Sequence, residues 1–112
     1  MTITELRRKL AELGWQFGKQ DAAHYGCDWY AYKRSALPAR ECECNHSGAQ
    51  IVITPYSHPA PIAGAWESVE VGIRGEHRGI WWKLDAYSLP PGEALDNLDT
   101  IERSLVAAWN AL

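Results

Sequence analysis

Residues 66–89 read WESVEVGIRGEHRGIWWKLDAYSL, two runs of alternating apolar and polar residues on either side of a short segment, EHR, that is flanked by glycines. An alternation with period two is typical of β-strands that bury one face. Two strands joined by such a short, glycine-flanked segment form a hairpin. This stretch therefore predicts two neighbouring antiparallel strands, to which the remaining segments of the chain can be related.

Two further strands are expected before this hairpin. Residues 27–35 (CDWYAYKRS) and 49–57 (AQIVITPYS) are rich in β-branched and aromatic residues and are bounded by Pro, Gly, Ser and Asn. This composition favours strands over helices. The four strands are therefore expected to form one antiparallel sheet.

Helices are expected at both ends of the chain. Thr2 and Glu5 have the spacing of a capping box, apolar residues then recur on one helical face, and Gly14 ends the segment. Residues 92–111 follow a proline pair and carry an apolar stripe with the helical period. The sequence thus predicts an α+β fold in the order α-β-β-β-β-α, an antiparallel four-stranded sheet with N- and C-terminal helices on one face.

Composition and charge argue against several classes of function. The chain has 112 residues, which suits a single compact domain over residues 1–112, and a net charge of −3. A negative net charge gives no attraction to nucleic acid, which is therefore not expected as a direct ligand. No apolar run is long enough to cross a bilayer, residues 1–10 lack the pattern of a secretory signal, and three cysteines fit a disulfide framework poorly. We therefore expect a cytoplasmic protein that makes no contact with a membrane.

The alternation within residues 66–89 predicts which side chains leave the core. The more uniformly apolar set is expected to point inward: Val69, Val71, Ile73, Ile80, Trp82, Leu84 and Ala86. The alternate set is polar but contains large aromatic residues, and it is expected to face outward: Trp66, Ser68, Glu70, Arg74, Trp81, Lys83, Asp85 and Tyr87.

Aromatic and arginine side chains on an outward face allow two interpretations. They can form cross-strand pairs that stabilise the sheet, or they can bind a protein partner, because Trp, Tyr and Arg are enriched among the residues that dominate binding energy. We take the second interpretation as a hypothesis. Its candidate residues are Trp66, Glu70, Arg74, Trp81, Lys83 and Tyr87, together with Asp96 and Asp99 of the C-terminal helix.

A cysteine-rich segment, residues 39–48 (ARECECNHSG), places Cys42, Cys44 and His46 at alternate positions. In an extended loop these side chains point the same way and could converge on zinc, with a fourth ligand from elsewhere. Their spacing differs from the paired C-x2-C pattern of structural zinc sites, so a loop without a metal is the preferred interpretation and no cofactor is expected. A small zinc-binding domain that organises a nucleic-acid or protein contact is the alternative function.

The sequence contains no familiar catalytic motif. It has no G-x-S-x-G elbow, no phosphate-binding P-loop, no dinucleotide-binding G-x-G-x-x-G after a strand and no H-E-x-x-H. All four histidines fall in expected loops or turns. We therefore expect a protein without enzymatic activity.

Four segments taken together, CDWYAYKR, CECN, GIWWKLDAYSLP and IERSLVAAWNAL, resemble small uncharacterised proteins encoded by phages and prophages of proteobacteria. Small non-enzymatic phage proteins commonly act by stoichiometric binding to a host factor, and anti-CRISPR inhibitors are one such class. The resemblance implies a protein-binding module that acts in the host cytoplasm on a host protein complex, for example to inhibit a defence system.

Overall fold

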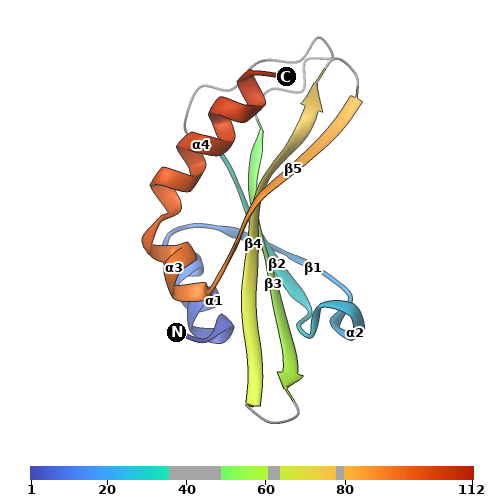
Figure 1. The fold of residues 1–112 in the computed structure, drawn as a ribbon, viewed down its shortest axis with the longest axis vertical. Coiled ribbons are helices and arrows are strands. Elements are labelled where there is room, and N and C mark those ends of the chain that lie inside the picture. Colours follow the sequence, from blue (N-terminus) through green and yellow to red (C-terminus); the bar gives the residue numbers. More distant parts are fainter. Residues whose placement is uncertain (36–48, 61–63, 78–79) are drawn as a thin grey trace.

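The structure, a computed structural model, describes residues 1–35, 49–60, 64–77 and 80–112. Its centre is an antiparallel sheet in which the strands have the same order in space as in sequence. The strands are β1 (Gln16–Lys19), β2 (Trp29–Arg34), β3 (Gln50–Ala60), β4 (Gly64–His77) and β5 (Ile80–Leu89). Helices α1 (Ile3–Glu12), α3 (Pro91–Asp96) and α4 (Leu98–Asn110) lie on one face of this sheet (Figure 1). The predicted α+β fold, with N- and C-terminal helices beside an antiparallel sheet, is confirmed.

The first helix begins and ends as its sequence predicts. Oγ1 of Thr2 accepts a hydrogen bond from the backbone N–H of Glu5 at 3.1 Å, which satisfies a donor at the start of α1. Gly14 follows the helix with φ 87°, a conformation that glycine adopts without strain.

A strand that the sequence analysis did not include, β1, precedes the four predicted strands. It pairs with β2, and the pairing runs from Gln16 opposite Tyr32 to Lys19 opposite Trp29. Its sequence, QFGK, contains a single large apolar residue, so no alternation was visible. A short helix, α2 (Ala22–Tyr25), connects β1 to β2.

The expected helix over residues 92–111 is divided into α3 and α4 at Asn97. The backbone of Asn97 has φ −114° and ψ 14°, and its side-chain amide donates to the carbonyl oxygen of Glu93 at 2.8 Å. Asparagine side chains compete for backbone groups in this way, which favours helix ends over helix interiors.

The core lies between the sheet and the helices. The predicted inward direction of Val69, Val71 and Ile73 is confirmed, since all three are fully buried. Burial of an aliphatic side chain of this kind stabilises the fold by about 1.5–3 kcal/mol. The core cluster also includes residues of β3 and of the two long helices: Ile51, Ile53, Ile3, Leu6, Leu10, Ile101, Leu105 and Trp109.

A bulge in β5 changes which of its side chains face the core. Val71 lies opposite Tyr87, but the next residue, Gly72, lies opposite Asp85, so Ala86 is an extra residue on β5. A bulge shifts the alternation by one position. Tyr87 therefore packs against the core, and the prediction that it faces outward was wrong.

The start of β5 is more exposed than its apolar sequence predicts. Ile80 is 58% exposed and Trp82 is 37% exposed, so the expectation that both belong to the core was wrong. Trp82 lies opposite Gly75 on β4. A Cβ atom on Gly75 would lie 3.2 Å from the ring of Trp109, which is 1% exposed. The indole of α4 therefore closes this end of the core.

Candidate functional site

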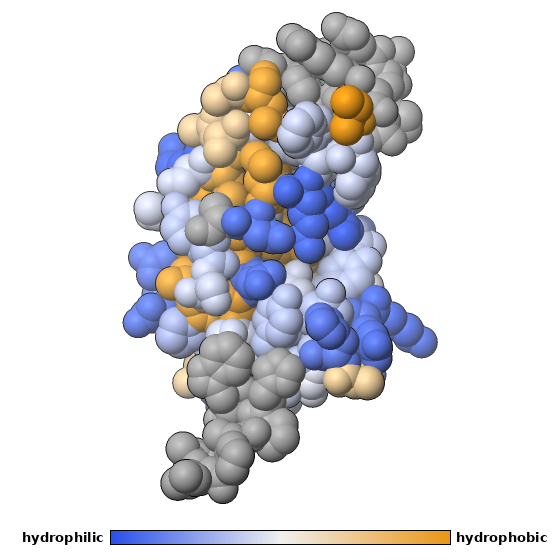
Figure 2. Space-filling view, turned by 45° about the vertical axis from the view of Figure 1, so that its right-hand side comes forward, coloured by the Kyte–Doolittle hydropathy of each residue, from blue (hydrophilic) through white to orange (hydrophobic). Residues whose placement is uncertain are grey.

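The sheet face that points away from α1, α3 and α4 is called the outward face here. The cross-strand register aligns its residues, as in the row formed by Gln50, Arg74 and Lys83 on β3, β4 and β5. Figure 2 turns this side of the molecule forward and shows hydrophilic side chains over its middle and lower right, with hydrophobic surface mainly along the left. The outward face is therefore largely polar.

Arg74 is held in a defined orientation on this face. Its Nε donates to Oε1 of Gln50 at 3.0 Å. Its guanidinium carbon lies 5.3 Å from the ring centroid of Tyr30 and 5.4 Å from that of Tyr32. Contacts between a cation and aromatic rings are attractive and fix the planar guanidinium. Arg74 is thus pre-organised for binding.

A hollow of about 320 Å³ opens beside Arg74 and is called the basic hollow here. It contains three cationic side chains but a single carboxylate, that of Asp21. The local charge is therefore positive although the chain carries a net charge of −3. The lining residues are Lys19, Gln20, Asp21, Tyr25, Tyr30, Val52, Thr54, Arg74 and Lys83.

An acidic group lies on the same face. Burial raises the pKa of Tyr56 to about 12, and the nearby carboxylate of Glu70, which accepts a hydrogen bond from the Tyr56 hydroxyl, adds to the increase. The charge of Asp85 contributes in the same direction. Tyr56 therefore stays protonated and remains a donor at neutral pH. The outward face combines positive and negative groups.

Three consecutive apolar residues at the start of β5 form a second feature, called the hairpin patch: Ile80, Trp81 and Trp82. Trp81 is 59% exposed. The alternation of β5 places it on the same face as Lys83, which lies opposite Arg74. Ile80 and Trp82 lie on the opposite side of the strand, so exposed apolar side chains are present on both faces at the start of β5.

The structure brings together four of the residues that the sequence proposed for partner binding. Arg74 and Lys83 are cross-strand neighbours, Trp81 follows on the same side of β5, and Glu70 lies further along β4. Their common face was predicted from alternation alone. Whether they bind a partner stays a prediction.

The other candidate residues do not join this group. Tyr87 is half-buried against the core, as described above. Asp96 and Asp99 are exposed beside a small hollow between α1 and the junction of α3 with α4, on the helix side of the sheet. The backbone of Trp66 pairs with His58, but its side chain lies outside the described part of the structure.

The contribution of β1 and β2 to the outward face was not predicted from the sequence. Tyr30 and Tyr32 occupy alternate positions in WYAYK, so the same alternation argument could have placed both on the outward face. Lys19 belongs to β1, whose residues show no alternation that would predict a strand. Its place in the basic hollow follows from tertiary structure only.

The cysteine-rich segment, with Cys42, Cys44 and His46, lies outside the described residues. Cys27 is described, and burial raises the pKa of its thiol. Its Sγ lies 3.5 Å from the carbonyl oxygen of Pro55. Within residues 1–35, 49–60, 64–77 and 80–112, no group of three or more His, Cys, Asp or Glu side chains is arranged to hold a metal ion.

None of the helices in the described ranges combines the length and the apolar composition that a membrane span requires. Comparisons of the chain with protein families, with curated proteins and with solved structures found no match.

Proposed function

We propose that this protein is a non-enzymatic binding module that acts by stoichiometric binding to another protein through the hairpin patch and the adjoining outward face. The observation that carries the proposal is the exposure of three large apolar side chains, Ile80, Trp81 and Trp82, at the start of an edge strand, with Trp81 on the outward face. Burial of apolar surface in an interface contributes about 25 cal/mol per Å², and tryptophan offers a large area with few rotatable bonds.

The polar residues beside the hairpin patch support this proposal. Arg74 is held by Gln50 and two tyrosine rings, so little side-chain entropy is lost when it binds. Lys83 and Glu70 add groups of both signs on the same face. An aromatic anchor with a polar rim is the usual arrangement of residues in protein interfaces.

The charge distribution favours a protein over a nucleic acid as partner. A long polyanion laid across the outward face would meet the basic hollow but also the carboxylates of Glu70 and Asp85. A protein surface can match both signs. The resemblance to phage and prophage proteins supports a host protein complex in the host cytoplasm, such as a defence system, as the target.

A capture experiment with matched variants tests the proposal. Tagged wild-type protein, Trp81→Ala and Leu13→Ala are used as baits in a lysate of a proteobacterial host, and the captured proteins are identified by mass spectrometry. Leu13 is the control because it is 63% exposed but lies at the end of α1, on the helix side. A genuine partner is retained by wild type and Leu13→Ala and is lost by Trp81→Ala.

Affinity measured with the purified partner completes the test. Trp81→Ala is expected to weaken binding by about 2 kcal/mol, roughly thirtyfold, while circular dichroism and melting temperature stay unchanged. Light scattering is expected to give a complex of fixed stoichiometry. Equal affinities of Trp81→Ala and Leu13→Ala would overturn the proposed role of the hairpin patch.

The acidic residues of the helix side are expected to act differently. Asp96→Asn and Asp99→Asn should change mainly the association rate and its dependence on salt, because exposed charges steer encounters more than they hold a complex together. A large increase in dissociation rate in these variants, with none in Trp81→Ala, would place the interface on the helix side.

A further inference from the structure

We infer that the basic hollow is a binding site for a small organic phosphate monoester. The inference goes beyond the proposed function, because the site lies where β1, α2 and β2 border the outward face and needs no residue of the hairpin patch, although it shares Arg74 and Lys83 with the proposed protein contact. Four observations carry the inference: a free guanidinium edge, two further cations, a set of hydroxyl donors and the size of the hollow.

Arg74 supplies the guanidinium edge. Among the described residues its hydrogen bond to Gln50 uses Nε, and its two terminal nitrogens make none. The rings of Tyr30 and Tyr32 hold the plane of the group. A planar fork of N–H donors matches the oxygens of a phosphate and can donate to two of them at once.

Lys19 and Lys83 supply the other positive charges. Within the described part of the chain, Lys19 has no ion pair. Lys83 lies 3.7 Å from Asp85, but both side chains are exposed, and such a pair contributes little stability. A phosphate monoester carries up to two negative charges at neutral pH and can therefore compete for Lys83.

Neutral donors complete the lining. Tyr25, Tyr30 and Thr54 are among the residues that line the hollow, and each of them carries a hydroxyl group. The only carboxylate of the lining, that of Asp21, accepts a hydrogen bond from the backbone N–H of Ala23 at 2.9 Å, where it caps α2. This bond offsets part of the repulsion that the carboxylate would exert on an anion.

The size of the hollow favours an ester over the free ion. A water molecule occupies about 30 Å³ of liquid, and a phosphate ion is only a few times larger. The hollow, at about 320 Å³, is at the lower end of the range for small-molecule sites. It therefore has room for a phosphate group and an attached organic part of a few atoms.

Titration with three probes tests this site. Ribose 5-phosphate, ribose and inorganic phosphate are added to the 15N-labelled full chain, and amide chemical shifts are followed. Ribose 5-phosphate is expected to bind saturably in the submillimolar range, with shifts at residues of β1, β2 and β4 around the hollow. Inorganic phosphate is expected to bind more weakly and ribose not at all. Absence of saturable binding of ribose 5-phosphate, or equal binding of any two probes, would overturn the inference.

Substitutions of residues that line the basic hollow test whether ribose 5-phosphate binds there. Arg74→Gln is expected to weaken binding of ribose 5-phosphate about tenfold, and Arg74→Lys, which keeps the charge but loses the fork, by less. Lys19→Gln, at an exposed position of β1, is expected to weaken it severalfold and remains informative if Arg74→Gln fails to fold. Arg103→Gln, exposed on α4, is the matched control and should bind as wild type. Equal binding by Lys19→Gln, Arg74→Lys and Arg103→Gln would overturn the inference.

One variant distinguishes failure of the proposed protein contact from failure of the phosphate site. Trp81→Ala should lose the protein partner and keep ribose 5-phosphate. Loss of both ligands by Trp81→Ala would show that the hairpin patch and the basic hollow are one site, against the inference.

Discussion

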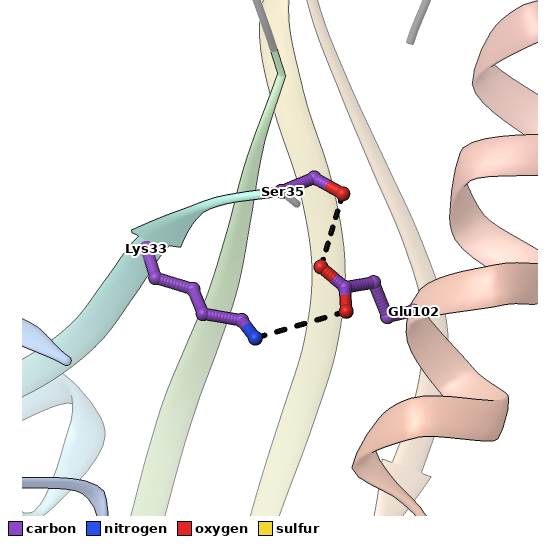
Figure 3. Close-up of polar contacts among 3 residues, drawn as sticks. All are labelled: Lys33, Ser35 and Glu102. Atoms are coloured by element: carbon purple, nitrogen blue, oxygen red, sulfur yellow. Dashed lines mark hydrogen bonds and ion pairs between the residues drawn. The ribbon is translucent and has the colours of Figure 1, made fainter. Parts of the chain in front are cut away.

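Oε2 of Glu102 in α4 lies 3.7 Å from Nζ of Lys33 in β2, across the inner side of the sheet (Figure 3). The other carboxylate oxygen accepts a hydrogen bond from Oγ of Ser35 at 3.0 Å. Glu102 is buried, while Lys33 keeps partial contact with water. Its ammonium also lies 5.2 Å from the ring centroid of Trp15. These contacts fix the position of α4 relative to β2.

Replacement of Glu102 by alanine is expected to lower the free energy of unfolding by about 1–3 kcal/mol, because the contacts that its buried carboxylate makes with Lys33 and Ser35 are lost. Urea denaturation measures the loss. Glu102→Gln keeps an acceptor for Ser35 and should lose less. A double-mutant cycle with Lys33→Met isolates the ion pair, and a coupling energy near zero would contradict its role in positioning α4.

The tryptophans near the β4–β5 hairpin are expected to differ strongly in how much each contributes to the stability of the protein. Trp109→Ala removes a buried indole and should cost about 3–5 kcal/mol, because a cavity remains over Gly75. Trp82→Ala removes a side chain that is more than one third exposed, and we expect a cost of about 1 kcal/mol. Chemical denaturation of both variants under the same conditions decides the matter. Equal costs would mean that Trp82 belongs to the core.

Two glycines with positive φ provide a test of the packing of α2 against β3. Gly26 has φ 82°, and a Cβ atom there would collide with the carbonyl oxygen of Ser57. Gly14 has φ 87°, but a Cβ atom there would meet nothing within 4 Å. Gly14→Ala should therefore cost about 1–2 kcal/mol from backbone strain alone. Gly26→Ala should cost about 3 kcal/mol or more, since the collision is added to the strain. Thermal denaturation compares them, and a smaller loss for Gly26→Ala would contradict the packing of α2 against β3.

The pKa of Tyr56, raised to about 12 from an ordinary value of 10.0, predicts a pH dependence of stability. Between these values the unfolded chain releases the phenolic proton and the folded chain keeps it. The contribution is therefore fully present below the lower value and is lost as pH rises towards the higher one. Tyr56→Phe should remove a decline of at most about 2 kcal/mol across this range.

The measurement for Tyr56 is urea denaturation at several pH values from about 9 to about 12, with wild type and Tyr56→Phe compared at each pH. Absorbance of the phenolate provides a direct check, because the increase in absorbance with a midpoint at about pH 12 should be missing in Tyr56→Phe. Parallel stability curves for the two proteins would contradict the contact between Tyr56 and Glu70.

Local sequence predicted the parts of the fold in which a single pattern dominates. Thr2 and Glu5 begin α1 because the cap needs only neighbouring residues. Val69, Val71 and Ile73 face the core because β4 pairs with β3 without a register shift over this stretch, and the extra residue of the bulge belongs to β5. The common face of Arg74, Lys83 and Trp81 follows from the same period.

The errors arose where distant residues decide the structure. The bulge at Ala86 turns Tyr87 inward, and no residue type in β5 indicates that a bulge is present. At the end of the sheet near Trp82 the core is closed by Trp109, which comes from another element and packs over Gly75. The ion pair of Lys33 with Glu102 joins residues far apart in sequence, so no local pattern predicts it.

The order of the elements also has a consequence for how the chain folds as it is synthesised. Every strand pairs with its neighbour in sequence, so the sheet can form progressively as the polypeptide leaves the ribosome. The layer that covers its apolar side, however, needs both α1 and the segment from Pro91 to Asn110. Until the last of these residues emerges, Ile51, Ile53 and Val71 remain open to water on a nearly complete sheet. Stalled or prematurely terminated chains should therefore be prone to aggregation and should depend on chaperones far more than the finished protein.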